Sequence, residues 1–223
     1  MRLIIGNKNY SSWSLRAWLA LKANGFVFEE ILLPLDTPEF YQRIAELNPS
    51  GKVPALLDDE LLVWDSLSII DYLHHCFPKL GIWPELPIDF ALAKSMSAEM
   101  HSGLHNLRAA MPMNIREKWD FFDFSETLQK DINRVQELWT QALTRKNNAG
   151  PFLFGTELTG ADFMFAPVVA RFRTYGVPLT DTCQAYADAV WQHPAMQEWI
   201  SGALAETEIV DADEIDTTLK LLG

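Results

Sequence analysis

Two short stretches of the chain carry groups that suit the two ends of a small peptide. Val53 precedes Pro54 in an extended loop that leads into a predicted strand, so its backbone amide and carbonyl are available to pair with an extended ligand. Asp65 and Ser66 begin a predicted helix, where a hydroxyl and backbone amides hold a carboxylate. Because the Asp65 carboxylate accepts an ammonium group, we expect a site for a small peptide with a free amine and a free carboxylate.

The pattern of apolar residues predicts that these stretches belong to a small α/β domain, residues 1–80. Predicted strands cover residues 3–5, 26–33, 55–57 and 61–64, and predicted helices cover 14–24, 37–48 and 66–76. The order βαβαββα implies a parallel strand pair followed by a hairpin, and therefore a mixed sheet. This is the thioredoxin-like arrangement.

Residues 79–88 contain a glycine and two prolines and predict a linker, after which the strand signals fade. Helical spacing then recurs over residues 89–111, 125–146, 160–175, 182–192 and 194–204. The fold class is therefore α/β followed by all-α, with the helical domain at residues 88–223. The acidic tail that begins at residue 206 is expected to pack loosely.

Charge and cysteine content exclude several classes of function. With 18 basic and 30 acidic residues among 223, the net charge is −12 and no basic block is present, so binding to nucleic acid is not expected. No apolar stretch approaches the roughly 18 residues of a membrane span. Cys76 and Cys183 lie far apart, which favours a reducing compartment, the cytoplasm, without a disulfide framework. His74 and His75 are adjacent on a helix and point in different directions, so we expect no metal site.

Three segments, in order and at these spacings, resemble the glutathione transferase family over the whole chain. Residues 10–16 are similar to the serine loop of zeta-type and related bacterial enzymes. Residues 48–54, together with residues 65–66, resemble the glutathione-binding signature, and residues 159–162 resemble the capping box of the helical domain. Trp13 stands where zeta enzymes have cysteine, a departure that argues against zeta isomerase activity.

The resemblance implies that glutathione is a co-substrate and assigns the groups that hold it. The Val53 backbone would pair with the cysteinyl part, and Pro54 would be cis. Ser66 would hold the γ-glutamyl carboxylate and Asp65 its ammonium, although Asp65 replaces the commoner Glu or Gln. Lys52 would bind another glutathione carboxylate.

A transferase of this kind must ionise the glutathione thiol, and one serine hydroxyl suffices to do so. Lowering a thiol pKa of about 8.5 by two units needs roughly 2.7 kcal/mol. A hydrogen bond to a charged group supplies roughly 1.5–3 kcal/mol, and a helix N-terminus adds roughly 0.3–1 kcal/mol. The family register places Ser11 at the catalytic position, and a shift of one residue selects Ser12. The alternative is that Ser12 or Ser14 caps the helix, the interpretation that we favour for Ser14.

The second-substrate pocket is expected between the domains, with Tyr10, Trp13, His105 and Arg108 as candidates and Arg108 binding an anionic acceptor. The resemblance implies a glutathione S-transferase that conjugates glutathione to small electrophiles. Two alternatives stay open: a glutathione-dependent isomerase of the maleylacetoacetate type, and a non-catalytic glutathione-binding module. The resemblance also implies a homodimer and a role such as detoxification.

Overall fold

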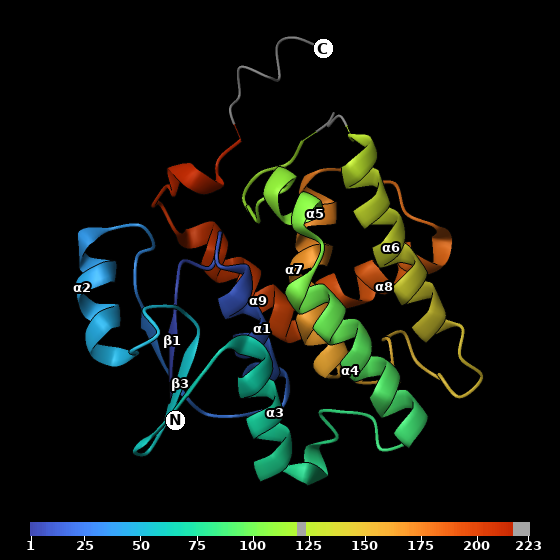
Figure 1. Ribbon diagram of the computed structural model, residues 1–223, viewed down its shortest axis with the longest axis horizontal. Coiled ribbons are helices and arrows are strands. Elements are labelled where there is room, and N and C mark those ends of the chain that lie inside the picture. Colours follow the sequence, from blue (N-terminus) through green and yellow to red (C-terminus); the bar gives the residue numbers. More distant parts are fainter. Residues whose placement is uncertain (120–123, 216–223) are drawn as a thin grey trace.

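The computed structural model describes residues 1–119 and 124–215 (Figure 1). The first part of the chain forms the predicted α/β unit. Its elements are β1 (Arg2–Ile5), α1 (Ser12–Ala23), β2 (Glu29–Leu32), α2 (Pro38–Leu47), β3 (Ala55–Asp58), β4 (Leu61–Trp64) and α3 (Ser66–Cys76). The strand order is β2-β1-β3-β4, with β1 parallel to β2 and antiparallel to β3. The mixed sheet and the βαβαββα order are confirmed.

Two predicted element boundaries in this part are wrong. The second strand begins at Glu29 rather than at residue 26, because its partner β1 begins only at Arg2, which pairs with Glu29. Residues 26–28 instead follow the end of α1, and the Phe26 amide donates to the Leu21 carbonyl. Helix α1 begins two residues earlier than predicted, at Ser12.

The remainder of the described chain is helical, as predicted. Two short 3₁₀ turns, Pro78–Leu80 and Asp211–Asp213, flank the helices. The helices are α4 (Pro87–Ser102), α5 (His105–Ala110), α6 (Glu126–Leu143), α7 (Gly160–Thr174), α8 (Asp181–Gln192) and α9 (Pro194–Ala205). The α7 capping box is confirmed, since the Asp162 carboxylate accepts hydrogen bonds from both the amide and the hydroxyl of Thr159. Among the described helices, none is long and apolar enough to cross a membrane.

The single helix predicted over residues 89–111 is wrong, because the chain breaks between α4 and α5. Gly103 is extended, and Leu104 adopts a left-handed conformation with φ of 55°. A left-handed residue cannot continue a right-handed helix, so α5 starts again in a new direction. The residues after the break therefore do not continue the face of α4.

Helix α1 joins the two parts of the molecule through one hydrophobic core. It packs against α3 on the sheet side and against α7 and α9 on the helical side (Figure 1). The same buried cluster contains Leu3 of the sheet, Trp18 of α1, Phe165 of α7 and Trp199 of α9. The elements that carry the predicted site residues are consequently fixed to one another by packing.

Candidate active site

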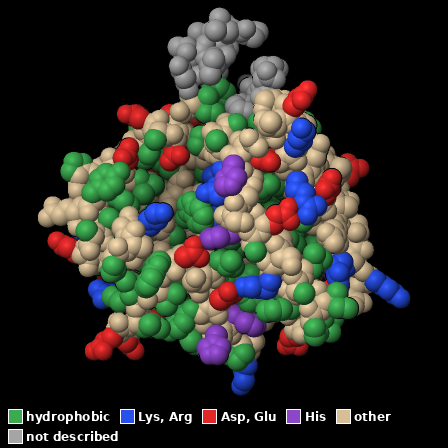
Figure 2. Space-filling view, viewed as in Figure 1, with side chains coloured by type: hydrophobic (Ala, Val, Ile, Leu, Met, Phe, Trp, Pro, Cys, Tyr) green, Lys and Arg blue, Asp and Glu red, His purple; other side chains and the backbone are tan. Residues whose placement is uncertain are grey.

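A cleft of about 960 Å³ lies between the α/β part and the helical part. The space-filling view shows a hollow in this face with acidic, basic and histidine side chains around it (Figure 2). The cleft is lined by every predicted site residue: Tyr10, Ser11, Ser12, Trp13, Lys52, Val53, Pro54, Asp65, Ser66, His105 and Arg108. The structure thus brings the predicted glutathione-binding residues and the predicted second-substrate residues together in one cavity. The serine loop (residues 10–16) lies between the two sets.

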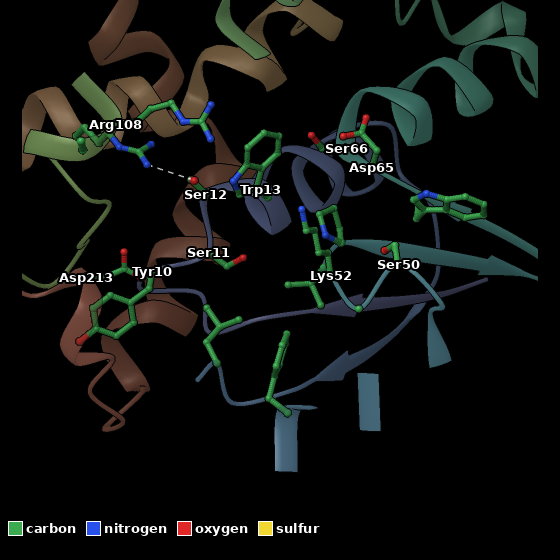
Figure 3. A pocket seen from close by; sticks show the side chains of 18 of the residues that line it. Tyr10, Ser11, Ser12, Trp13, Ser50, Lys52, Asp65, Ser66, Arg108 and Asp213 are labelled. Atoms are coloured by element: carbon green, nitrogen blue, oxygen red, sulfur yellow. Dashed lines mark hydrogen bonds between the residues drawn. The ribbon is translucent and has the colours of Figure 1, made fainter. Parts of the chain in front are cut away.

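Ser11 is the N-cap of α1, and its side chain lines the cleft. Its Oγ accepts a hydrogen bond from the Ser14 amide at 3.3 Å and donates to Ser14 Oγ at 2.7 Å. Ser14 lies inside the helix, fully buried, and its Oγ accepts from the Gly6 amide. The interpretation of Ser14 as the cap is therefore wrong. In Figure 3 the Ser11 hydroxyl points toward the loop that contains Lys52.

Ser12 instead faces the helical part of the molecule. Its Oγ accepts a hydrogen bond from Arg171 Nη2 at 3.3 Å, drawn as the dashed line in Figure 3. Arg171 is buried on α7, and its Nε donates to the Met111 carbonyl at 2.7 Å. Burial, followed by the nearby charge of Arg108, lowers the pKa of Arg171 to about 10, so it remains a cation at neutral pH. Arg171 was not predicted as a site residue from the sequence, where its signal is a charge that follows the apolar run of residues 163–170.

The loop before β3 presents its backbone to the cleft. The Val53–Pro54 peptide bond is cis, as predicted from the resemblance. β3 begins at Ala55, so Val53 lies outside the sheet ladder. The side chain of Asn48 donates to the Lys52 carbonyl at 2.7 Å and fixes the loop, whereas the Lys52 side chain is exposed at its rim. Asn48 therefore fixes the loop through the Lys52 carbonyl, while Val53 lines the cleft and is accessible to a ligand.

Asp65 and Ser66 line the cleft beside this loop, at the N-terminus of α3, because Ala55 pairs with Trp64 in the β3–β4 hairpin. One carboxylate oxygen of Asp65 caps this helix by accepting from the amides of Leu67 and Ser68 at 3.0 and 3.1 Å. Ser66 is fully buried, and Arg16 Nη1 lies 3.5 Å from its Oγ. These donors at a helix N-terminus make this part of the cleft suited to a carboxylate.

Arg16 is a second buried cation that the sequence analysis missed. Burial is the main cause that lowers its pKa to about 9, with further lowering by Arg171 and Arg108 and an opposing effect of Asp65. Its Nε has no hydrogen-bond partner within the described residues. The only sequence signal was a charged residue on the buried side of a predicted helix. A carboxylate bound beside Ser66 would be attracted by this cation.

The Trp13 ring lies beside two cations, Arg16 of α1 and Arg108 of α5. The guanidinium carbons of Arg16 and Arg108 lie 4.3 and 4.8 Å from the Trp13 ring centroid. Burial lowers the pKa of Arg108 from its usual value. His105 is exposed at the edge of the cleft. Arg108 and Arg171 give the part of the cleft next to the helical domain a positive character that suits an anionic molecule.

Tyr10 lines the cleft, but its hydroxyl is engaged elsewhere. It donates to the Glu214 carboxylate and accepts from Arg116 Nη2 at 2.8 Å. Burial, followed by the hydrogen bond to Glu214, raises the pKa of Tyr10. The Tyr10 ring therefore shapes the cleft, while its hydroxyl connects the serine loop to Glu214 and Arg116.

The expectation of a loosely packed tail is wrong for residues 206–215. The Glu206 carboxylate accepts from the amides of Lys8 and Asn9 at 2.6 and 3.0 Å, directly before the serine loop. Arg116 donates to the carbonyls of Glu206 and Glu208. The tail thereby fixes the approach to the serine loop, and its residue Asp213 completes the cleft wall.

Over residues 1–119 and 124–215, no three histidine, cysteine, aspartate or glutamate side chains are grouped so that they could hold a metal ion. Beside the carboxylates of Asp65 and Asp213 and the imidazole of His105, the cleft presents hydroxyls, helix N-termini and buried cations. The hydroxyls, helix N-termini and cations are the groups that suit anions, and they stabilise a thiolate.

Residues 10–76 match the family model "Glutathione S-transferase, N-terminal domain", and residues 108–201 match "Glutathione S-transferase, C-terminal domain". A zeta-class glutathione S-transferase of Euphorbia esula is 30% identical over 180 residues, which cover 76% of each chain. A probable maleylacetoacetate isomerase of Caenorhabditis elegans is 28% identical over 172 residues, covering 76% of this chain and 77% of its own.

The fold is also shared with solved structures. The crystal structure of a maleylacetoacetate isomerase from Methylobacterium extorquens, with bound malonate and glutathione, has a TM-score of 0.67 at 21% identity. The superposition covers 91% of this chain and 97% of that one. The two matched domains, the relatives and the shared fold agree, and the chain belongs to the glutathione S-transferase family.

Proposed function

We propose that the cleft binds glutathione and that Ser11 activates its thiol for attack on a small electrophile. The observation that carries this proposal is the position of the Ser11 hydroxyl, which points toward the loop that contains Lys52 (Figure 3). Val53 of that loop lies beside Asp65 and Ser66 at the α3 N-terminus, because Ala55 pairs with Trp64 in the β3–β4 hairpin. A tripeptide held along these neighbouring segments has its central cysteine near the α1 N-terminus.

The proposed roles follow from the chemistry of each group. The carboxylate of the γ-glutamyl residue binds Ser66 in the field of Arg16, and its ammonium binds Asp65. Lys52 at the rim attracts the glycine carboxylate. Ser11 rotates its hydroxyl proton from Ser14 Oγ to the sulfur, which together with the helix N-terminus favours the thiolate. The thiol proton passes to water, and the thiolate attacks the electrophilic carbon. As the C–S bond forms, the bond from that carbon to the leaving group breaks, and with 1-chloro-2,4-dinitrobenzene the leaving group is chloride.

The acceptor is proposed to carry a negative charge. Arg108 and Arg171 both reach the cleft from the helical part, and Trp13 supplies an apolar surface beside them. This feature favours a second candidate function, isomerisation of a maleylacetoacetate-like diacid, since two arginines suit two carboxylates. The isomerase names of two relatives support it, and Trp13 in place of the family cysteine argues against it.

Calorimetry and two activity assays test these functions. We expect reduced glutathione to bind with saturation at millimolar concentration or below, and conjugation to 1-chloro-2,4-dinitrobenzene or an anionic electrophile to follow. Isomerisation of maleylacetoacetate without measurable conjugation would favour the second candidate. Binding without either reaction would favour a non-catalytic glutathione-binding module, and an absence of binding would contradict all three.

The proposal extends to assembly and location. We propose a homodimer, supported by the exposed apolar side chains of Ile88 and Phe90 on α4, which a partner subunit would cover. Light scattering that gives a monomer mass at micromolar protein would contradict it. A cytoplasmic location is supported by the free thiols of Cys76 and Cys183. Detoxification is the proposed physiological role.

A further inference from the structure

His101 of α4 reaches across from the helical part of the molecule to Asp65, on the glutathione side of the cleft. Its Nε2 lies 3.3 Å from Asp65 Oδ2. The other Asp65 oxygen, Oδ1, is already occupied by the two amides of α3 that it caps. Oδ2 is therefore the oxygen left for a ligand, and His101 is the side chain that faces it.

The surroundings of His101 fix its protonation. A nitrogen that faces a carboxylate favours the proton, so the neutral ring carries its proton on Nε2, on the side of Asp65, and leaves Nδ1 as an acceptor. Nδ1 is buried without a hydrogen-bond partner in the described part of the chain. The edge of the ring packs against Trp13, with centroids 5.1 Å apart. These contacts hold the imidazole in one orientation.

We propose that His101 is a positioning residue for glutathione binding, which aims Asp65 Oδ2 at the α-ammonium of the γ-glutamyl residue. This inference rests on the proposed function, because it assumes that glutathione occupies the cleft. Aspartate is one methylene shorter than the Glu or Gln that is commoner at this position, so its reach into the cleft is less. A fixed donor behind the short carboxylate compensates by holding its free oxygen in place.

The arrangement makes glutathione binding depend on the charge of His101. The charged groups that act on it are Asp65, which favours the protonated ring, and Arg16 and Arg108, which disfavour it. Burial is the largest effect and lowers the pKa of His101. A protonated ring would pair with Oδ2 as a full ion pair and repel the incoming ammonium. Glutathione should therefore bind the neutral form, and its Kd should rise by up to about tenfold per pH unit below the pKa of His101.

The test is calorimetry of S-methylglutathione, which has no thiol to ionise, with the full chain from about pH 5 to about pH 7.5, a range in which the carboxylates and amine of this ligand do not change charge. The wild-type Kd should rise toward low pH. His101→Gln places an amide donor where Nε2 was and cannot titrate, so its Kd should match wild type at neutral pH and stay flat. His101→Leu removes the donor and should raise the KM for glutathione at least fivefold with little change in kcat. His75→Gln, an exposed histidine on α3, is the matched control and should keep the wild-type profile.

The outcomes separate this inference from the proposed function. If His101→Gln keeps the wild-type pH dependence, or if His105→Gln removes it instead, His101 does not position Asp65 and the inference is overturned. If wild type binds no glutathione at any pH, the proposed function fails first. A readout without substitution is the NMR titration of His101 in wild type: saturating glutathione should lower its pKa, and an unchanged pKa would also overturn the inference.

Discussion

Replacing Ser11 with alanine separates the two roles that the structure gives to this hydroxyl. As the thiol donor it supplies roughly 1.5–3 kcal/mol to the thiolate, which equals about 1–2 pKa units at 1.36 kcal/mol per unit. A bound thiol with a pKa near 6.5 should shift to about 8. At pH 7 the ionised fraction would then fall from roughly three quarters to roughly one tenth, and kcat/KM should fall about eightfold.

Two assays measure the effect on the thiol and on the fold. Titration of bound glutathione by its thiolate ultraviolet absorbance gives the pKa, and kcat/KM of Ser11→Ala should recover at high pH. The glutathione Kd should stay within about threefold of wild type, since the walls of the cleft hold the peptide. Loss of the N-cap bond to the Ser14 amide should also cost about 0.5–2 kcal/mol of stability.

Two neighbouring substitutions complete the experiment. Ser14→Ala removes the group that receives the Ser11 proton in the free protein, so the thiol pKa should remain low. Ser12→Ala removes the partner of Arg171 and should leave the thiol pKa within about half a unit of wild type. A raised thiol pKa in Ser12→Ala, with Ser11→Ala unchanged, would refute the reasoning and make Ser12 the donor.

Three further predictions concern Arg171, Tyr10 and Glu206. Arg171→Met should raise the KM of an anionic acceptor at least tenfold, about 1.4 kcal/mol, and that of an uncharged acceptor far less; equal effects in steady-state kinetics would contradict an anion-binding role. Tyr10→Phe should lower the free energy of unfolding in urea by about 1–3 kcal/mol, because Glu214 and Arg116 each lose a partner; an unchanged midpoint would show that the tail is not held by Tyr10. Burial raises the pKa of Glu206 above its value in the unfolded chain, so its contribution to stability is largest below about pH 4.5 and is lost as the pH rises through the raised value. In Glu206→Gln, the free energy of unfolding measured in urea should lack this pH dependence. The same pH profile in the variant and in wild type would contradict the prediction.

Local sequence patterns predicted much of the fold because they reflect local physics. The strands and helices around Val53, Pro54 and Asp65 were recognisable from periodicity and from breaker residues. The break at Gly103 was not, since a lone glycine is tolerated inside a helix and the left-handed Leu104 has no sequence signature. The length of the second strand was also overestimated, because a strand ends where its partner ends.

The candidate site could be predicted only in part. Motif resemblance located the serine loop and the peptide-binding walls, because each lies within one short segment. Arg16 and Arg171 were missed, since their roles depend on contacts between segments as far apart as Ser12 and α7. The tail was misjudged for the same reason: Glu206 accepts from the distant amides of Lys8 and Asn9, and an acidic stretch alone is typical of a solvated terminus.

The continuous apolar cluster around α1 has a consequence for how the protein denatures. Since Trp18 is covered by α9 as well as by the sheet side, neither half retains a complete interior when the other is lost. Differential scanning calorimetry should therefore show one heat-absorption peak with equal calorimetric and van't Hoff enthalpies. A fragment limited to the first 80 residues would expose the apolar surface of α1 to solvent and should aggregate rather than fold independently.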